Sequence, residues 1–326
     1  MGTMRYIIQR LFYGLILVCG VVILNFFLIH AAPGDVAEVI AGEMGGITEE
    51  MMAEIRAQYG LDKPVIVQLG LYLGQVLQGN LGVSYHFDRP VTDLIWQKAG
   101  ATILLALSAQ VIAMVVGVTL GVLSSRKPQG ILSGFVSVFS TVGYAAPVFW
   151  TGLMLVILFS VVIPIFPVEG MVSARFRGSS FDYILNVAHH LVLPASTLAI
   201  LFLAQYARLS RAAMIEVLGA DYVRTARAKG LGEWRVTFHH ALRNAVLPIL
   251  TIAGIQFGNL ISGALLVETV FNWPGMGRLA FDSVLRRDFP TLLGVLFFAS
   301  LVVVIANLLT DLSYRLADPR IRTGGR

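Results

Sequence analysis

The sequence predicts an all-α membrane protein, and two observations lead to this prediction. Of 326 residues, 56% are hydrophobic and only 13% are charged, whereas a soluble domain carries about 25% charged residues. The charged residues are also clustered, so the apolar stretches between them are long. An α-helix needs about 17 to 25 such residues to cross a bilayer. We therefore expect a polytopic bundle of membrane-spanning helices.

Six apolar runs are long enough to be spans. They lie near residues 7–29, 101–123, 131–163, 191–207, 246–267 and 291–309. The third run is too long for one straight helix and has Pro147 in its middle, so a kink, a tilt or a boundary nearer Gly143 should absorb the excess. A cleaved signal peptide is the alternative for the first run. Its apolar core is longer than that of a signal peptide, and no clean cleavage site follows it.

The distribution of Lys and Arg predicts the orientation. With the N-terminus inside, the inside segments are 1–10, 124–130, 208–245 and 310–326, and together they carry 15 Lys and Arg against 5 Asp and Glu. The outside segments carry 9 against 14. The positive-inside rule therefore places both termini in the cytoplasm. The net charge of +5 needs no nucleic acid to explain it.

The spans divide the chain into four predicted parts. These are the N-terminus with the first span (1–29), an outside helical insert (30–100), a membrane core (101–313) and a cytoplasmic tail (314–326). Within the insert, Thr48 and Gly60 are suited to cap a short helix. A second helix should begin after Pro64, because apolar residues recur at helical spacing from there. We expect it to pack on the bundle or lie at the interface.

Several kinds of chemistry have no residues to support them in this sequence. The cores of the six spans lack Asp, Glu, Lys, Arg and His, whereas ion-coupled transporters need ionisable groups within the membrane. There is no phosphate-binding loop of the Walker type. Cys19 is the only cysteine, and the adjacent histidine pairs 189–190 and 239–240 are poorly placed to share a metal. We therefore predict no catalytic residue and no metal site.

One polar stretch, residues 221–244, lies between the fourth and fifth spans. Asp221 is suited to cap a helix that runs to about Lys229, where Gly230 and Gly232 would end it. A second helix would then lead into the fifth span. Tyr222 and Ala226 are predicted to share one face, which a partner surface could approach closely. A basic loop held by anionic lipid headgroups would also account for the charge.

The same stretch resembles the cytoplasmic signature loop of binding-protein-dependent ABC importer permeases. The resemblance is closest to the first permease subunit of the dipeptide, oligopeptide and nickel branch, and it covers nearly the whole chain. The motifs occur in order: PGDVAEVIAG, YGLDKPVIVQ, GNLGVSY, HLVLPASTLA, RLSRAAMIEVLGADYVRTARAKGLGEWRVTFHHALRNAVLP, ETVFNWPGMGRLAFDSVLRRDFP and LADPRIR. Of the general family pattern, this loop keeps Ala226, Gly230 and Leu242. Its other departures match the peptide branch.

The resemblance implies that the short helix is a coupling helix, which transmits the motion of a cytoplasmic ATPase. The residues expected to contact the ATPase are Asp221, Tyr222, Arg224, Thr225, Ala226, Arg227, Ala228, Lys229 and Gly230. It further implies a homologous second permease, two ATPase subunits and an extracytoplasmic substrate-binding protein as partners. ATP and Mg would bind to the ATPases, and this chain would hold no cofactor. The expected location is the bacterial inner membrane.

The expected solute is a peptide, with nickel, glutathione-like peptides and oligosaccharides as alternatives. Gln256, Asn259 and Ser262 lie on one face of the fifth span and are predicted to line the path, although hydrogen bonding between helices explains such a face equally well. An outer gate is expected from Glu268, Trp273, Pro274 and Gly275. Two other classes of protein remain as alternatives: an ion-coupled or channel-like transporter that works alone, and a membrane enzyme.

Overall fold

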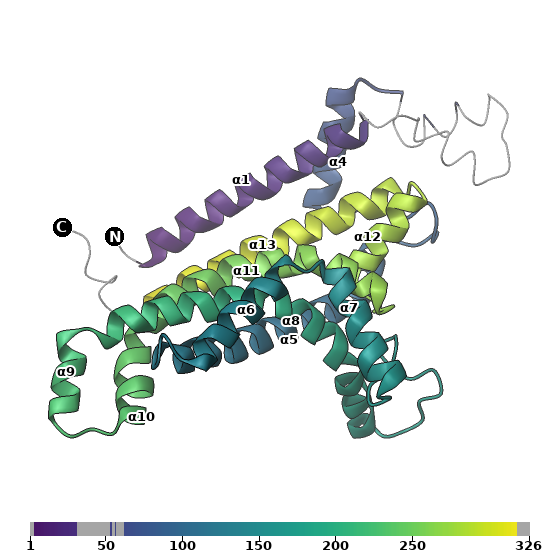
Figure 1. Cartoon of the computed structure of the whole chain (residues 1–326). Coiled ribbons are helices and arrows are strands. Elements are labelled where there is room, and N and C mark those ends of the chain that lie inside the picture. The colour runs from purple at the N-terminus through teal and green to yellow at the C-terminus, as the bar shows by residue number, and fades with distance from the viewer. Residues whose placement is uncertain (1–2, 31–52, 54–55, 57–61, 318–326) are drawn as a thin grey trace. The chain divides into compact units, whose positions relative to one another are not determined.

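A computed structural model describes residues 3–30 and 62–317, together with the isolated positions 53 and 56. The regular elements in these ranges are helices (Figure 1), apart from one isolated β-bridge between Val83 and Pro90. They are α1 (Thr3–His30), α4 (Val65–Leu77), α5 (Val91–Ser125), α6 (Ile131–Ala145), α7 (Val148–Val156), α8 (Ser180–Leu218), α9 (Asp221–Ala228), α10 (Glu233–Arg235), α11 (Leu242–Val270), α12 (Met276–Leu285) and α13 (Phe289–Ala317). Two π-helical turns, Ile157–Val162 and Val236–Ala241, extend α7 and α10. The helix expected over 48–60 lies outside the described residues.

The described helices account for the predicted spans. Helices α1, α5, α8 and α13 are each long and apolar enough to cross a membrane. Two further pairs of helices meet the same test jointly, each bent at a short break: one spans residues 131–162 and the other 233–260. If each pair is one span, the total is six. The all-α membrane bundle predicted from composition is thus confirmed.

The third apolar run is broken at Pro147. Helix α6 ends at Ala145, α7 begins at Val148, and the two are bent by 107°. Ala146, between them, has extended backbone angles (φ −72°, ψ 132°). A residue before proline prefers this conformation, because the proline ring clashes with a preceding helical residue. The bend is therefore larger than the kink that the sequence predicts, and a re-entrant pair is the alternative to one broken span.

The chain divides into two compact units, which we describe separately. Unit 1 comprises residues 1–100 and 278–304. In it, the ring of Phe26 from α1 stacks on Tyr72 of α4 at 5.9 Å between centroids. The helix predicted after Pro64 is confirmed as α4, and it has no fully buried residue.

Elsewhere in unit 1, a buried carboxylate links the segment around Ser84 to the start of α13. Asp288, at the start of α13, is 1% exposed and accepts hydrogen bonds from Ser84 Oγ at 2.5 Å and Thr291 Oγ1 at 2.7 Å. The backbone N–H of Tyr85 donates to the same carboxylate at 3.2 Å. These hydrogen bonds satisfy the polar side chain, although it is buried. The GNLGVSY motif is thereby held to the segment that opens α13.

Unit 2 comprises residues 101–277 and 305–326, and α8 lies at its centre. Helices α6, α7 and α11 all pack on α8. The part of α5 in this unit approaches α8 closely through glycine: a Cβ added to Gly117 would lie 2.7 Å from Tyr206 Cβ and 2.8 Å from Leu203 O. Close backbone approach at small residues is a usual means of packing helices in membranes. The core around this contact is aliphatic and aromatic.

Candidate functional site

The polar stretch after α8 forms a helical hairpin. Helix α9 runs from Asp221 to Ala228, and a turn leads to α10 and, through a π-helical turn, into α11. Figure 1 shows α9 and α10 projecting together from one end of the helices that they connect. Gly230 has φ +76°, the left-handed conformation that ends helices, and its N–H donates to Arg227 O at 2.9 Å. The predicted helix, its glycine stop and the second helix are confirmed.

The predicted cap at Asp221 is wrong. The N-cap is Ala220, which forms no side-chain cap, and Asp221 is the first helical residue. Its carboxylate instead lies 2.9 Å from Arg224 Nη2. An acidic residue in the first turn still interacts favourably with the helix dipole, which accounts for the position of this residue without a capping bond.

The prediction that Tyr222 and Ala226 share a face open to a partner is also wrong. Ala226 is 7% exposed and packs with Val223 and Val236, which are both fully buried. Tyr222, which was expected to share its face, is 43% exposed. Val223 and Ala226 are three positions apart and form the apolar side of α9, so burial of this pair fixes the rotation of the helix about its axis. The face available to a partner is the opposite one.

That outward face is polar. Eight of the nine predicted coupling residues are exposed: Asp221, Tyr222, Arg224, Thr225, Arg227, Ala228, Lys229 and Gly230. Arg227 Nε donates to Glu233 Oε1 at 2.9 Å across the turn, and this hydrogen bond lowers the pKa of Glu233. Asn244 Nδ2 of α11 donates to the hydroxyl of Tyr222 at 2.8 Å. Helix α9 is therefore held by its own chain at both ends, with a cationic surface outward.

The predicted polar face of the fifth span is connected to α8. Gln256 is 4% exposed and donates from Nε2 to Oε1 of Gln205, and Asn259 Nδ2 donates to Gln256 Oε1 at 3.0 Å. Asn259 itself is exposed. The side chain of Ser262 lies outside the described part. The network fits hydrogen bonding between helices, and Asn259 is exposed whereas Gln205 is partly buried and Gln256 is buried. That the face lines a path stays a prediction.

A second polar pair in unit 2 was not predicted. Gln110 of α5 donates from Nε2 to the hydroxyl of Tyr206 at 2.8 Å and to Ala253 O at 2.9 Å, which joins α5 to α8 and α11. Among the described residues, no group satisfies its Oε1. The signal was present in the sequence as the one amide side chain in the second apolar run, residues 101–123.

The residues expected to form an outer gate are mostly buried. Glu268 and Trp273 are both 0% exposed. Thr102 Oγ1 donates to Glu268 Oε1 at 2.6 Å and accepts from the Met276 N–H at 2.8 Å, while Trp273 Nε1 donates to Ala101 O at 2.9 Å. A Cβ at Gly275 would collide with the Glu268 carboxylate, so the glycine is required there. These residues fasten the turn after α11, and a gating role remains a proposal.

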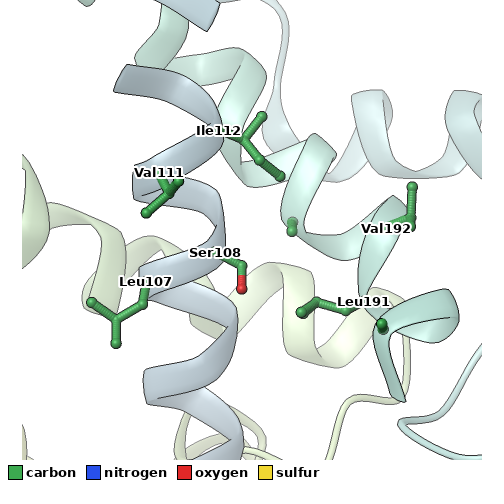
Figure 2. A pocket seen from close by; sticks show the side chains of 8 residues that line it. Leu107, Ser108, Val111, Ile112, Leu191 and Val192 are labelled. Carbon is green, nitrogen blue, oxygen red and sulfur yellow. The ribbon is translucent and has the colours of Figure 1, made fainter. Parts of the chain in front are cut away.

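An apolar pocket of about 440 Å³ lies between α5 and α8 in unit 2 (Figure 2). Its lining is Leu107, Ser108, Val111 and Ile112 from α5, and Ala188, Leu191, Val192 and Ala195 from α8. The Ser108 hydroxyl is the one polar side-chain group in this lining. A nucleophilic serine needs an adjacent base, and the pocket offers none. Within the described residues, no group of three His, Cys, Asp or Glu could hold a metal ion either.

Together, the fold and the hairpin define a multi-pass helical membrane protein with a short helix held outside its bundle. Residues 113–323 match the family described as "Binding-protein-dependent transport system inner membrane component", and residues 3–106 match the N-terminal model of such membrane components. The chain belongs to this family of inner-membrane transport components. The family assignment made from the ordered motifs is confirmed.

Relatives align over almost the full length. The chain is 42% identical to the "Probable peptide ABC transporter permease protein y4tP" of Sinorhizobium fredii, over 97% of this chain and 99% of the relative. It is 39% identical to the "Dipeptide transport system permease protein DppB" of Escherichia coli strain K12, over 98% and 99%. The solved inward-facing MetNI methionine ABC transporter matches with a TM-score of 0.55 at 16% identity, over 69% of this chain and 96% of that chain. The last match shows a shared fold.

Proposed function

We propose that this protein is the permease subunit of an ATP-driven peptide importer and forms half of the translocation path. The observation that carries the proposal is α9: a helix of eight residues with its apolar side buried against its own chain and its polar side exposed. A plain connector between spans needs neither the buried Val223 nor the bridge from Arg227 to Glu233. Both are explained if the helix must transmit force from a partner.

Peptides are the favoured solute class. Relatives that align end to end are named for transport of dipeptides or oligopeptides, including "Oligopeptide transport system permease protein AppB" of Bacillus subtilis at 38% identity. A path for variable peptides should bind its cargo weakly, and the sparse polar groups of unit 2 suit such a path. Nickel, glutathione-like peptides and oligosaccharides are the alternatives, because the substrate-binding protein would select the solute.

The partners follow from the proposed role. A homologous permease would complete the path, two ATPase subunits would receive α9, and an extracytoplasmic binding protein would deliver the solute. ATP and Mg would bind to the ATPases and no cofactor to this chain. Both termini and the 208–245 loop would lie in the cytoplasm, as the Lys and Arg distribution favours. An ion-coupled transporter is less favoured, since the span cores lack ionisable side chains.

The role of α9 can be tested by obstructing its outer face. Ala228 is exposed on α9, so Ala228→Trp should leave the chain folded while it keeps the ATPase away. Ala212→Trp is the matched control, because Ala212 is exposed on α8 and outside the hairpin. We expect Ala228→Trp to lose ATPase copurification and uptake of a labelled dipeptide. If both readouts equal those of the control, the coupling assignment fails.

A further inference from the structure

A cationic pocket of about 510 Å³ lies in unit 2 beside the hairpin, and it shares Arg227 with the outward face of α9. It forms between the short 124–130 connection and the loop that carries α9. Its lining residues are Leu123, Arg126, Lys127, Gly130, Ile131, Leu132, Leu218, Arg227, Glu233 and Thr237. The pocket thus joins the two segments that the charge distribution assigns to the same side of the membrane.

The polar part of this lining is suited to an anion. It contains three cationic side chains and one carboxylate, and that carboxylate, Glu233, is already paired with Arg227. The guanidinium of Arg126 lies 5.2 Å from the centroid of the Trp234 ring. A cation–π contact of this kind does not use the N–H donors of the guanidinium in a hydrogen bond. Arg126 and Lys127 are both exposed, so these two adjacent side chains can reach a ligand.

Apart from Thr237 and Gly130, the remaining lining is apolar and continues onto the exposed surface of α6. Ile131 and Leu132 are the first residues of α6, an apolar helix, and are 95% and 43% exposed. Leu123 and Leu218 complete the apolar side. A pocket with cations at one end and aliphatic side chains at the start of an apolar helix fits an amphipathic molecule better than a small soluble anion.

Thr237 provides an independent indication of a missing polar partner. It lines the pocket and is 0% exposed, yet no group in the described residues hydrogen-bonds its hydroxyl. Buried hydroxyl groups are nearly always satisfied. Thr237 also lies in the π-helical turn Val236–Ala241, and such turns occur frequently at functional sites.

From these observations, we propose that the pocket binds the phosphate of an anionic phospholipid. Arg126 and Lys127 would contact the phosphate, and the acyl chains would lie along Ile131 and Leu132. Basic pockets at the cytoplasmic ends of membrane helices bind anionic headgroups in this way. The proposal rests on the proposed function only for its placement at the cytoplasmic leaflet. Because Arg227 lines the pocket, a bound lipid would hold the 124–130 connection against the base of α9.

Trp234 offers a local probe, since Arg126 lies 5.2 Å from its ring centroid and the residue is 61% exposed. The full chain would be reconstituted in phosphatidylcholine vesicles in which either phosphatidylglycerol or phosphatidylcholine carries brominated acyl chains, which quench nearby tryptophan. The chain has four tryptophans, so subtraction of the Trp234→Phe signal isolates this one. We expect brominated phosphatidylglycerol to quench Trp234 at a mole fraction about fivefold lower than brominated phosphatidylcholine.

Matched variants distinguish a pocket from general surface charge. The double substitution Arg126→Gln and Lys127→Gln should abolish the preference for phosphatidylglycerol. Arg243→Gln is the control and should keep the preference, because Arg243 is exposed in the 208–245 loop but does not line the pocket. Equal quenching by both lipids, or an equal loss in both variants, would overturn the proposal. Inorganic phosphate at millimolar concentration should not relieve the quenching. Relief of the quenching by inorganic phosphate would mean that the pocket binds a soluble anion instead. Loss of ATPase copurification by Lys127→Gln, with its lipid preference intact, would mean that the pocket serves another ligand. None of these readouts depends on transport.

Discussion

At the residue scale, one hydroxyl group holds the C-terminal end of α11 in place. Thr102 Oγ1 donates to the buried Glu268 carboxylate and accepts from the Met276 N–H. Removing it leaves a buried acceptor and a buried donor without this partner, and each such loss costs about 1–3 kcal/mol. Thr102→Val should therefore lower the melting temperature of the detergent-solubilised protein, whereas Thr102→Ser, which keeps the hydroxyl, should stay close to the unmodified protein. Equal melting temperatures for the two variants would show that the contact is unimportant.

Substitution of two small residues of the hairpin, Ala226 and Gly230, should destabilise it for different physical reasons. Ala226 is buried against Val223 and Val236, so Ala226→Leu overpacks this contact at a cost of typically 1–3 kcal/mol. Gly230 has open space around its Cβ position but φ +76°, so Gly230→Ala introduces backbone strain of roughly 1–2 kcal/mol without a clash. We expect limited proteolysis to cleave the hairpin faster in both, and Gly230→Asn to recover most of the loss, because Asn tolerates this conformation. No recovery by Asn would rule out the strain explanation.

At the scale of the element, sequence patterns predicted the long helices better than they predicted which side of a short helix is buried. Apolar runs identify spans directly, since length and hydropathy decide whether a helix can cross the bilayer. The orientation of α9 was not predictable in this way. Its two apolar positions, Val223 and Ala226, have meaning only through Val236, which lies beyond the glycine turn. The large bend at Pro147 likewise depends on how α6 and α7 pack on α8, although the proline marked its position.

On the polar face of α11, we expect Gln256 to have a structural role and Asn259 a functional one. Gln256 is buried and hydrogen-bonds Gln205 and Asn259, so Gln256→Leu leaves two amides without their partner and should destabilise the protein. Asn259 is exposed, so Asn259→Leu should preserve assembly while it reduces peptide uptake. Thermal stability and uptake, measured together on both variants, test this division. Normal uptake in Asn259→Leu would mean that the face only packs helices and that the path lies elsewhere.

At the scale of the whole molecule, the number of crossings depends on the bent pair α6 and α7. If this pair crosses the membrane, the 124–130 connection and the α9 hairpin lie on the same side, because α8 crosses back. If the pair re-entered and returned, the two loops would lie on opposite sides, and the contact of Arg126 with the Trp234 ring at 5.2 Å argues against this arrangement. Charge favours the first arrangement, since both segments are basic while 164–190 carries equal numbers of acidic and basic residues. The two arrangements therefore make opposite predictions for a pair of exposed lysines.

Three single cysteines decide between these arrangements. In a Cys19→Ser background, cysteine would replace Lys127, Arg175 or Lys229, all exposed in the structure. We expect a membrane-impermeant thiol reagent to label the Arg175 variant in intact spheroplasts, and the Lys127 and Lys229 variants only after permeabilisation. The reason is that each crossing reverses the side, and the basic segments remain in the cytoplasm. Labelling of Lys229→Cys but not Lys127→Cys in intact cells would identify a re-entrant pair. It would also place α9 outside, where no cytoplasmic ATPase could reach it.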